Sequence, residues 1–199
     1  MMIKYIYDHH KAIEAAVWTL SHQNAPVTSL KLIELLYLAE RESLCHNGFP
    51  LMGDLIVSTD QGPILAQTSA LANGNHDNAA MQGEWNAHIH RSHSSHQMLV
   101  SAVKSTSTKN SADKFRSLSE SDRDILDTIN ATYGTMTAAE LLELSYELPE
   151  WKNPHGVPTP INPANMLQAV GMSPEQIAAL SIAAQERYGL HQILARPIN

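Results

Sequence analysis

Four histidines spaced two or three residues apart are the strongest sign of metal chemistry in this sequence. Two histidines that lie two residues apart on a β-strand point to the same side and could share one ion. The nearby carboxylates, Asp77 and Glu84, are few, and the flanking residues lack the apolar frame of a rigid site. We therefore interpret the segment as an exposed polar hairpin and expect no metal or cofactor, with a metal-dependent enzyme as an alternative. The candidate ligands are His88, His90, His93 and His96.

Other reactive side chains form no recognisable catalytic motif. Cys45 and His46 are adjacent, and adjacent residues of a helix point about 100 degrees apart, so we expect Cys45 to be a half-buried structural residue. His9 and His10 are expected to be solvated near the start of a helix. The sequence contains no GxSxG, GxxxxGK, HExxH or dinucleotide-binding glycine pattern. We therefore predict that the chain is not an enzyme.

Acidic residues dominate between positions 120 and 150, where Arg123 is the single base. The negative electrostatic potential of these residues could steer a basic partner toward the chain. The simpler interpretation is that the acids lie on two solvated helix faces, with the early ones favourably placed at helix N-termini. Trp151 follows this region, and its residue type alone favours a place in the core, with a partner anchor as the alternative.

The first half of the chain predicts two helices and then a mixed region. Asp8 can cap a helix that ends before a polar loop at residues 22–26, and Thr28 or Ser29 can cap a second helix that stops at Asn47-Gly48. In the second helix, Lys31, Glu34, Glu40 and Glu42 are interspersed with an apolar stripe. Residues 54–58 predict a short strand, and residues 60–63 predict a turn into a third helix, which starts with Pro63 and ends at Asn73-Gly74.

The rest of the chain predicts a small β element and further helices. Residues 73–84 are expected to form a polar loop, residues 85–91 and 96–103 two short strands, and residues 104–114 a connector. Capping residues predict helices that start after Ser119 and Thr137, the first ending at Gly134. Five prolines between positions 149 and 163 exclude a helix or a central strand there. A helix is expected to start at residues 173–176 and to end at Gly189.

Composition agrees with a single compact domain of mainly α (α+β) class, helical with a small antiparallel β element. The chain has 199 residues, 43% of them hydrophobic, and a formal net charge of −7 from 13 basic and 20 acidic residues. This charge disfavours nucleic acid as a partner. A single cysteine excludes an intrachain disulfide, and no apolar run is long enough to span a membrane. We therefore expect a cytoplasmic protein with no membrane association.

An ordered set of short motifs resembles the Panacea domain, also called SocA-like. The first is Lys31-Leu32-Ile33-Glu34-Leu35-Leu36-Tyr37-Leu38-Ala39, followed by Gly48-Phe49-Pro50-Leu51 and by Gly62-Pro63-Ile64. In the second half, Asp124-Ile125-Leu126, Tyr133-Gly134 and Pro149-Glu150-Trp151 are similar in order and spacing to the closing helices and the Pro/Trp element of that family. The resemblance covers residues 11–153, and residues 162–189 would be a C-terminal helical extension of a single domain spanning 1–199.

The resemblance implies a bacterial or prophage-borne antitoxin of a toxin-antitoxin system. Such a protein binds a co-encoded protein toxin directly, and some members deliver a partner to a cellular protease, which makes a protease adaptor the second alternative. By analogy, the partner-binding surface would lie near the Gly62-Pro63 turn and the Pro/Trp element, with acidic helix residues beside it. The residues expected to bind the partner are Asp60, Gln61, Glu143, Glu147 and Trp151.

Overall fold

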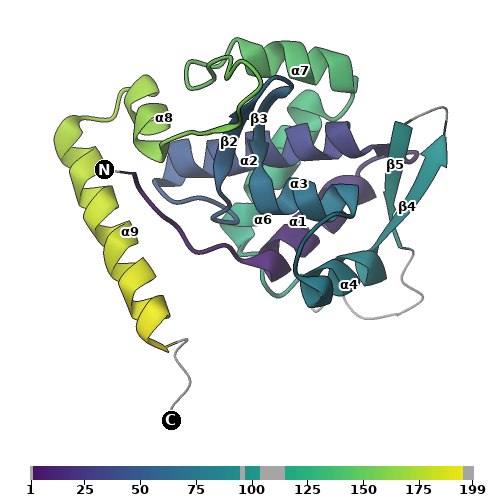
Figure 1. Ribbon diagram of the computed structural model, residues 1–199, viewed down its shortest axis with the longest axis horizontal. Helices are drawn as coiled ribbons and strands as arrows, with labels where there is room; N and C mark the ends of the chain where they lie inside the picture. Colours follow the sequence, from purple (N-terminus) through teal and green to yellow (C-terminus); the bar gives the residue numbers. More distant parts are fainter. Residues whose placement is uncertain (1, 95–96, 104–114, 195–199) are drawn as a thin grey trace.

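The computed structural model describes residues 2–94, 97–103 and 115–194, which form a mainly helical fold with two small antiparallel sheets (Figure 1). The predicted fold class is confirmed. No helix in the described ranges is long and apolar enough to cross a membrane. The helices are α1 (His9–Ser21), α2 (Ser29–Asn47), α3 (Ala66–Asn73), α4 (Ala79–His88), α6 (Glu120–Tyr133), α7 (Ala138–Tyr146), α8 (Pro163–Ala169) and α9 (Pro174–Leu194). The strands are β1 (Val27–Thr28), β2 (Ile56–Thr59), β3 (Gly62–Leu65), β4 (Ile89–Ser94), β5 (Gln97–Ala102) and β6 (Thr159–Pro160).

Helix α2 forms the centre of the core and crosses the middle of the molecule in Figure 1. Its N-cap is Thr28, whose side chain accepts a hydrogen bond from the Lys31 backbone N–H, and it ends at Asn47 as predicted. Helices α1, α3, α6, α7 and α8 all pack against it. Because α2 has neighbours on all sides, its glutamates at positions 34 and 40 are buried together with its leucines.

The β2–β3 hairpin corrects the predicted start of the third helix. Thr59 pairs with Gly62, so Asp60 and Gln61 form a two-residue turn, and Pro63 lies in strand β3 rather than in the first turn of a helix. The proline is tolerated because β3 is an edge strand of the sheet β3-β2-β6, where its missing N–H removes no ladder hydrogen bond. Helix α3 begins at Ala66, three residues after the predicted start, and its end at Asn73, before Gly74, is the predicted one.

Residues 73–88 contain a helix that the sequence interpretation missed. Asn78 caps α4 by accepting hydrogen bonds from the Ala80 and Met81 backbone N–H groups, so the predicted polar loop is wrong. Trp85 is fully buried on α4, and this tertiary contact stabilises a helix where a strand was expected. Strands β4 and β5 follow as an antiparallel hairpin, with β1 on the far side of β5. Ser95, His96 and the predicted connector at residues 104–114 lie outside the described residues.

The later helices begin where their capping residues predict. Ser119 and Asp122 form a capping box at α6, and Thr137 and Glu140 form one at α7. Helix α9 starts at Pro174 but continues through Gly189 to Leu194, because one helical glycine costs only about 1 kcal/mol. Helices α8 and α9 contribute to the same core as the rest of the molecule, through the buried side chains of Met166, Leu167 and Ala184.

Candidate functional site

The turn of the β2–β3 hairpin is held by residues from two other segments of the chain. The Trp151 indole Nε1 donates a hydrogen bond to the Thr59 carbonyl oxygen at 3.1 Å, and the Tyr146 hydroxyl donates one to the Asp60 carbonyl oxygen at 2.9 Å. The Gly156 backbone N–H donates to Asp60 Oδ1 at 3.0 Å. Three segments therefore meet at one end of the molecule: helix α7, the hairpin turn, and the proline-rich loop at residues 149–163.

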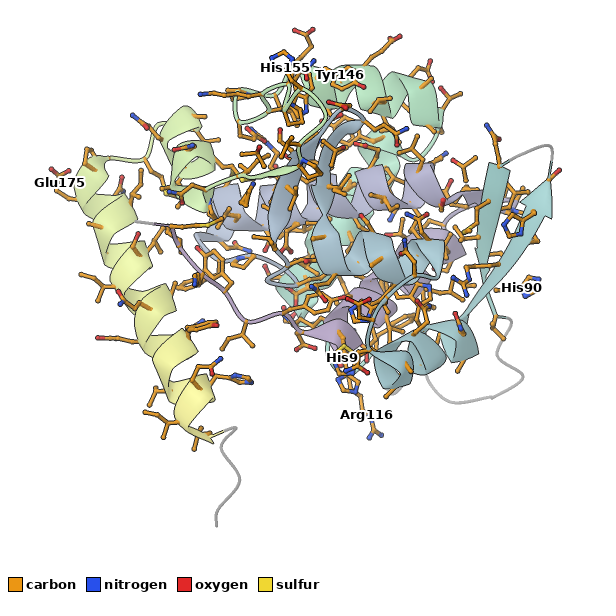
Figure 2. The ribbon with its side chains drawn as sticks, in the orientation of Figure 1. His9, His90, Arg116, Tyr146, His155 and Glu175 are labelled. Atoms are coloured by element: carbon orange, nitrogen blue, oxygen red, sulfur yellow. The ribbon has the colours of Figure 1, made fainter. Side chains whose placement is uncertain are left out.

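An aromatic pair lies at this end, where Figure 2 labels Tyr146. The rings of Tyr146 and Trp151 are 4.6 Å apart between centroids and tilted by 46°. Trp151 is half-buried, so it both fixes the proline-rich loop to the hairpin and keeps part of its ring accessible.

Two predicted partner residues, Glu143 and Glu147, are exposed on and just after α7. They are four residues apart with Tyr146 three residues after Glu143, so the three side chains share one helical face. All five residues predicted to bind a partner therefore come from three segments that the structure brings together. We call the following set the hairpin-end surface: Asp60, Gln61, Glu143, Tyr146, Glu147 and Trp151.

The hairpin-end surface carries a local excess of negative charge. Asp60, Glu143 and Glu147 are exposed, and the exposed Lys152 is the nearest base along the chain to Trp151. A cavity of about 480 Å³ lies beside the hairpin turn and is lined by Ile33, Asp60, Gln61 and Pro158, among others. This end of the molecule thus combines an aromatic pair, a shallow hollow and carboxylates.

The acidic region predicted at positions 120–150 is smaller than the sequence indicates, because two of its members are buried in ion pairs. Glu150 accepts hydrogen bonds from Arg41 Nε at 2.6 Å and from the Tyr37 hydroxyl at 2.7 Å. Asp122 pairs with the Lys11 ammonium at 2.7 Å. Glu150 therefore anchors the Pro/Trp element to α2 instead of facing a partner.

Beneath the hairpin, the fully buried Glu34 has no hydrogen-bond partner for either carboxylate oxygen among the described residues. Burial raises the pKa of Glu34 to about 8, an effect that the nearby Ser145 hydroxyl opposes. Gly62 covers it closely: its φ is +90°, and an added Cβ would lie 2.7 Å from Ser145 Oγ and 3.5 Å from Glu34 Oε1. Burial therefore favours the protonated form of the Glu34 carboxyl under the hairpin-end surface.

Farther along α2, the fully buried Glu40 has a different environment. Its carboxylate accepts hydrogen bonds from the Met52 backbone N–H at 2.6 Å and from the Asp54 backbone N–H at 3.0 Å. Burial raises the pKa of Glu40 to about 7, and these backbone donors oppose the effect. Asp54 in turn accepts from the backbone N–H groups of Gln67 and Thr68 at the start of α3. Two carboxylates therefore link α2, the loop at residues 51–54 and α3.

Sequence interpretation missed both buried glutamates, although a signal was present. Glu40 lies four residues after Leu36 and four residues before Leu44. It therefore falls on the same helical face as the apolar stripe of α2. Glu34 precedes Leu38 by four residues and is in phase with it in the same way. A carboxylate in phase with a buried stripe predicts a buried carboxylate.

The histidines considered as alternative metal ligands form no ligand cluster among the described residues. His88 ends α4, while His90 and His93 lie on β4 at positions of opposite parity, which point to opposite faces of the strand. Figure 2 shows His90 projecting from the β4 strand. The cluster of potential ligands found in the described ranges is a different one: His9, His10 and Glu84, whose ligand atoms all lie within 4.8 Å of one another. His96 lies outside the described residues.

One family model matches the chain. It is described as antitoxin SocA-like, Panacea domain, and it covers residues 32–152, which is more than half of the 199 residues. Among curated proteins and among solved structures, no significant match was found. The matched region contains α2 from Leu32 onward, the hairpin, α7 and Trp151, and so includes the whole hairpin-end surface. On this match, the chain belongs to the SocA-like, Panacea-domain antitoxin family.

Proposed function

We propose that this chain is an antitoxin of a bacterial or prophage toxin-antitoxin system, which neutralises a co-encoded protein toxin by direct binding. The observation that carries the proposal is the family match, whose span contains every residue of the hairpin-end surface. The chain acts in this proposal as a binding protein and not as an enzyme, and it meets its partner in the cytoplasm.

The hairpin-end surface has the chemistry that a protein interface needs. Tyr146 and Trp151 offer the type of aromatic residue that most often carries binding energy at an interface centre. Asp60, Glu143 and Glu147 are exposed near this pair and would contribute mainly to the rate of association. The toxin that fits this surface has an apolar patch bordered by lysine or arginine.

The first experiment expresses the product of the neighbouring open reading frame with and without this chain, and it scores growth and copurification together. We expect growth arrest by the neighbour alone, rescue by co-expression, and a stable complex. Rescue with no complex, or no toxicity of either neighbour, would contradict direct neutralisation. Faster decay of the neighbour in the presence of this chain would favour a protease adaptor instead.

Charge reversal then locates the interface. The double variant Glu143→Lys/Glu147→Lys should lower the association rate with the toxin by about tenfold at low salt, and by less at high salt. The matched control is Glu175→Lys/Glu186→Lys, which makes the same change of charge on exposed positions of α9. Equal rates for the two variants would remove the hairpin-end surface from the electrostatic part of binding.

A further inference from the structure

The N-terminus of α1 and the middle of α4 bring three metal-ligating side chains together. His9 Nε2 lies 3.1 Å from Glu84 Oε2, and His10 Nε2 lies 3.2 Å from Glu84 Oε1. Each carboxylate oxygen therefore faces one imidazole nitrogen, and the two rings are themselves 3.9 Å apart between centroids. The residues are separated by more than seventy positions in the sequence and meet because α1 packs on α4.

The spacing of these ligand atoms agrees with tetrahedral zinc. Zinc lies about 2.0–2.1 Å from histidine nitrogen and about 2.0–2.2 Å from carboxylate oxygen, which places neighbouring ligand atoms about 3.3 Å apart along a tetrahedral edge. The two nitrogen–oxygen distances of 3.1 and 3.2 Å are each close to this value, but they end on different oxygens of Glu84, so an ion held through one oxygen requires the carboxylate to turn. One ligand atom from each residue, the two imidazoles included, lies within 4.8 Å of the others, so a bound ion would draw the three side chains closer together.

Among the described residues, the surroundings hold the cluster in place and leave a cavity on one side of it. Trp85, next to Glu84, is fully buried, so α4 is fixed against the core at this point. Lys11 is paired with Asp122, and the Glu14 carboxylate accepts hydrogen bonds from Ser117 and Leu118, so neither competes for the three ligands. A cavity of about 330 Å³, lined by His10, Glu84 and His88 among others, provides room for a fourth ligand.

We propose that His9, His10 and Glu84 form a binding site for one zinc ion, with the fourth position open toward this cavity. Two imidazoles and one carboxylate form the ligand set of many three-ligand zinc sites, and imidazole nitrogen disfavours magnesium and calcium. The bound ion links the start of α1 to α4, two elements that otherwise meet through packing and the Glu84 contacts. Zinc therefore binds the folded chain and stabilises it.

The test is calorimetric titration of the full chain, free of any histidine tag, with zinc chloride. We expect one zinc ion per chain, a melting temperature that rises with zinc, and no heat from magnesium chloride at the same concentration. The variants Glu84→Gln and His9→Gln/His10→Gln should each weaken zinc binding by at least about tenfold. Cobalt chloride serves as a spectroscopic probe, since tetrahedral cobalt absorbs in the visible range.

A matched control separates this site from the histidines of β4. The variant His90→Gln/His93→Gln removes two exposed histidines and should leave zinc uptake unchanged. Circular dichroism spectra and zinc-free melting temperatures of all variants check that they fold. The proposal is overturned if the wild-type chain takes up no stoichiometric zinc, or if uptake persists in the folded Glu84→Gln and His9→Gln/His10→Gln variants.

Discussion

The two buried glutamates of α2 lie six residues apart and are surrounded in opposite ways. Glu40 accepts two backbone hydrogen bonds from the loop at residues 51–54, which is itself tied to α1 because the Asp8 N–H donates to the Met52 carbonyl oxygen at 2.9 Å. Glu34 accepts none among the described residues. Glu40 is desolvated but accepts backbone hydrogen bonds, whereas Glu34 is desolvated with only the nearby Ser145 hydroxyl to oppose the effect of burial.

This difference separates a fixed region from an adjustable one. Around Glu40, buried hydrogen bonds connect α1, α2 and α3. Over Glu34, the hairpin turn is held by hydrogen bonds that are exposed or only partly buried, from Tyr146, Trp151 and Gly156. Regions held mainly by exposed hydrogen bonds open at lower free energy, and binding surfaces are often drawn from them. We therefore expect the hairpin end to adapt to a partner while the Glu40 region stays unchanged.

The largest expected effect comes from removing the carboxylate at the fixed region. Glu40→Ala should lower the free energy of unfolding by about 3 kcal/mol or more, because it leaves two buried backbone N–H groups unpaired and opens a cavity. Denaturant unfolding monitored by circular dichroism measures the loss. Glu42→Ala, at a partly exposed position of the same helix, is the control and should change stability by less than about 0.5 kcal/mol. A small effect of Glu40→Ala would contradict the stabilising role of the Glu40 carboxylate.

A pair of glycine substitutions compares the two regions directly. Gly53 and Gly62 both have positive φ, of +72° and +90°. An added Cβ at Gly53 would overlap the Ile6 carbonyl oxygen, which is backbone and cannot move alone, whereas at Gly62 it would meet a serine hydroxyl that can rotate. We expect Gly53→Ala to cost about 3 kcal/mol and Gly62→Ala about 1 to 2 kcal/mol in unfolding experiments. Equal costs would mean that the hairpin end is as rigid as the Glu40 region.

The smallest expected effect is a pH dependence specific to Glu34. Its folded pKa of about 8 lies above the unfolded value of 4.5, so its stabilising contribution is present at low pH and is lost as the pH rises through about 8. Glu40 acts in the same direction but mostly below its pKa of about 7. Between pH 7 and pH 8 the chain should therefore lose about 1 kcal/mol, and Glu34→Gln should remove most of that loss. Denaturant midpoints measured at the two pH values for both chains provide the test, and parallel losses would refute it.

Local signals in the sequence predicted several helix boundaries. Four capping residues form the cap that their residue type indicates: Asp8, Thr28, Ser119 and Thr137. Each side chain accepts a hydrogen bond from the backbone N–H three residues later, so the interaction is local in the sequence. The hairpin and α4 were mistaken because their identity depends on distant partners. A Gly-Pro pair fits a helix start and an edge strand equally well, and only the pairing with β2 distinguishes them. Helix α4 has a weak apolar pattern, and it depends on the burial of Trp85.

The candidate site also combines features that the sequence predicted with features that depend on contacts between distant segments. The five residues predicted for partner binding come from separate segments of the sequence. The structure brings these segments to one surface, where Glu150 fixes the Pro/Trp element to α2 through its hydrogen bonds with Arg41 and Tyr37. The histidine group was interpreted as an exposed polar hairpin, and His90 and His93 are exposed on β4, where strand alternation points them to opposite faces. The cluster of His9, His10 and Glu84 could not be seen from spacing, because its members belong to two helices far apart in the sequence.

Residue patterns along the chain were sufficient to predict the helical class, several helix starts and the family, since these patterns extend over a few tens of positions. Which charged groups are buried, which of them have hydrogen-bond partners, and which side chains meet became visible in the folded structure. Burial and pairing are properties of contacts between distant segments. Two glutamates of one helix can therefore look alike in the sequence and differ in hydrogen bonding, in pKa and in what surrounds them.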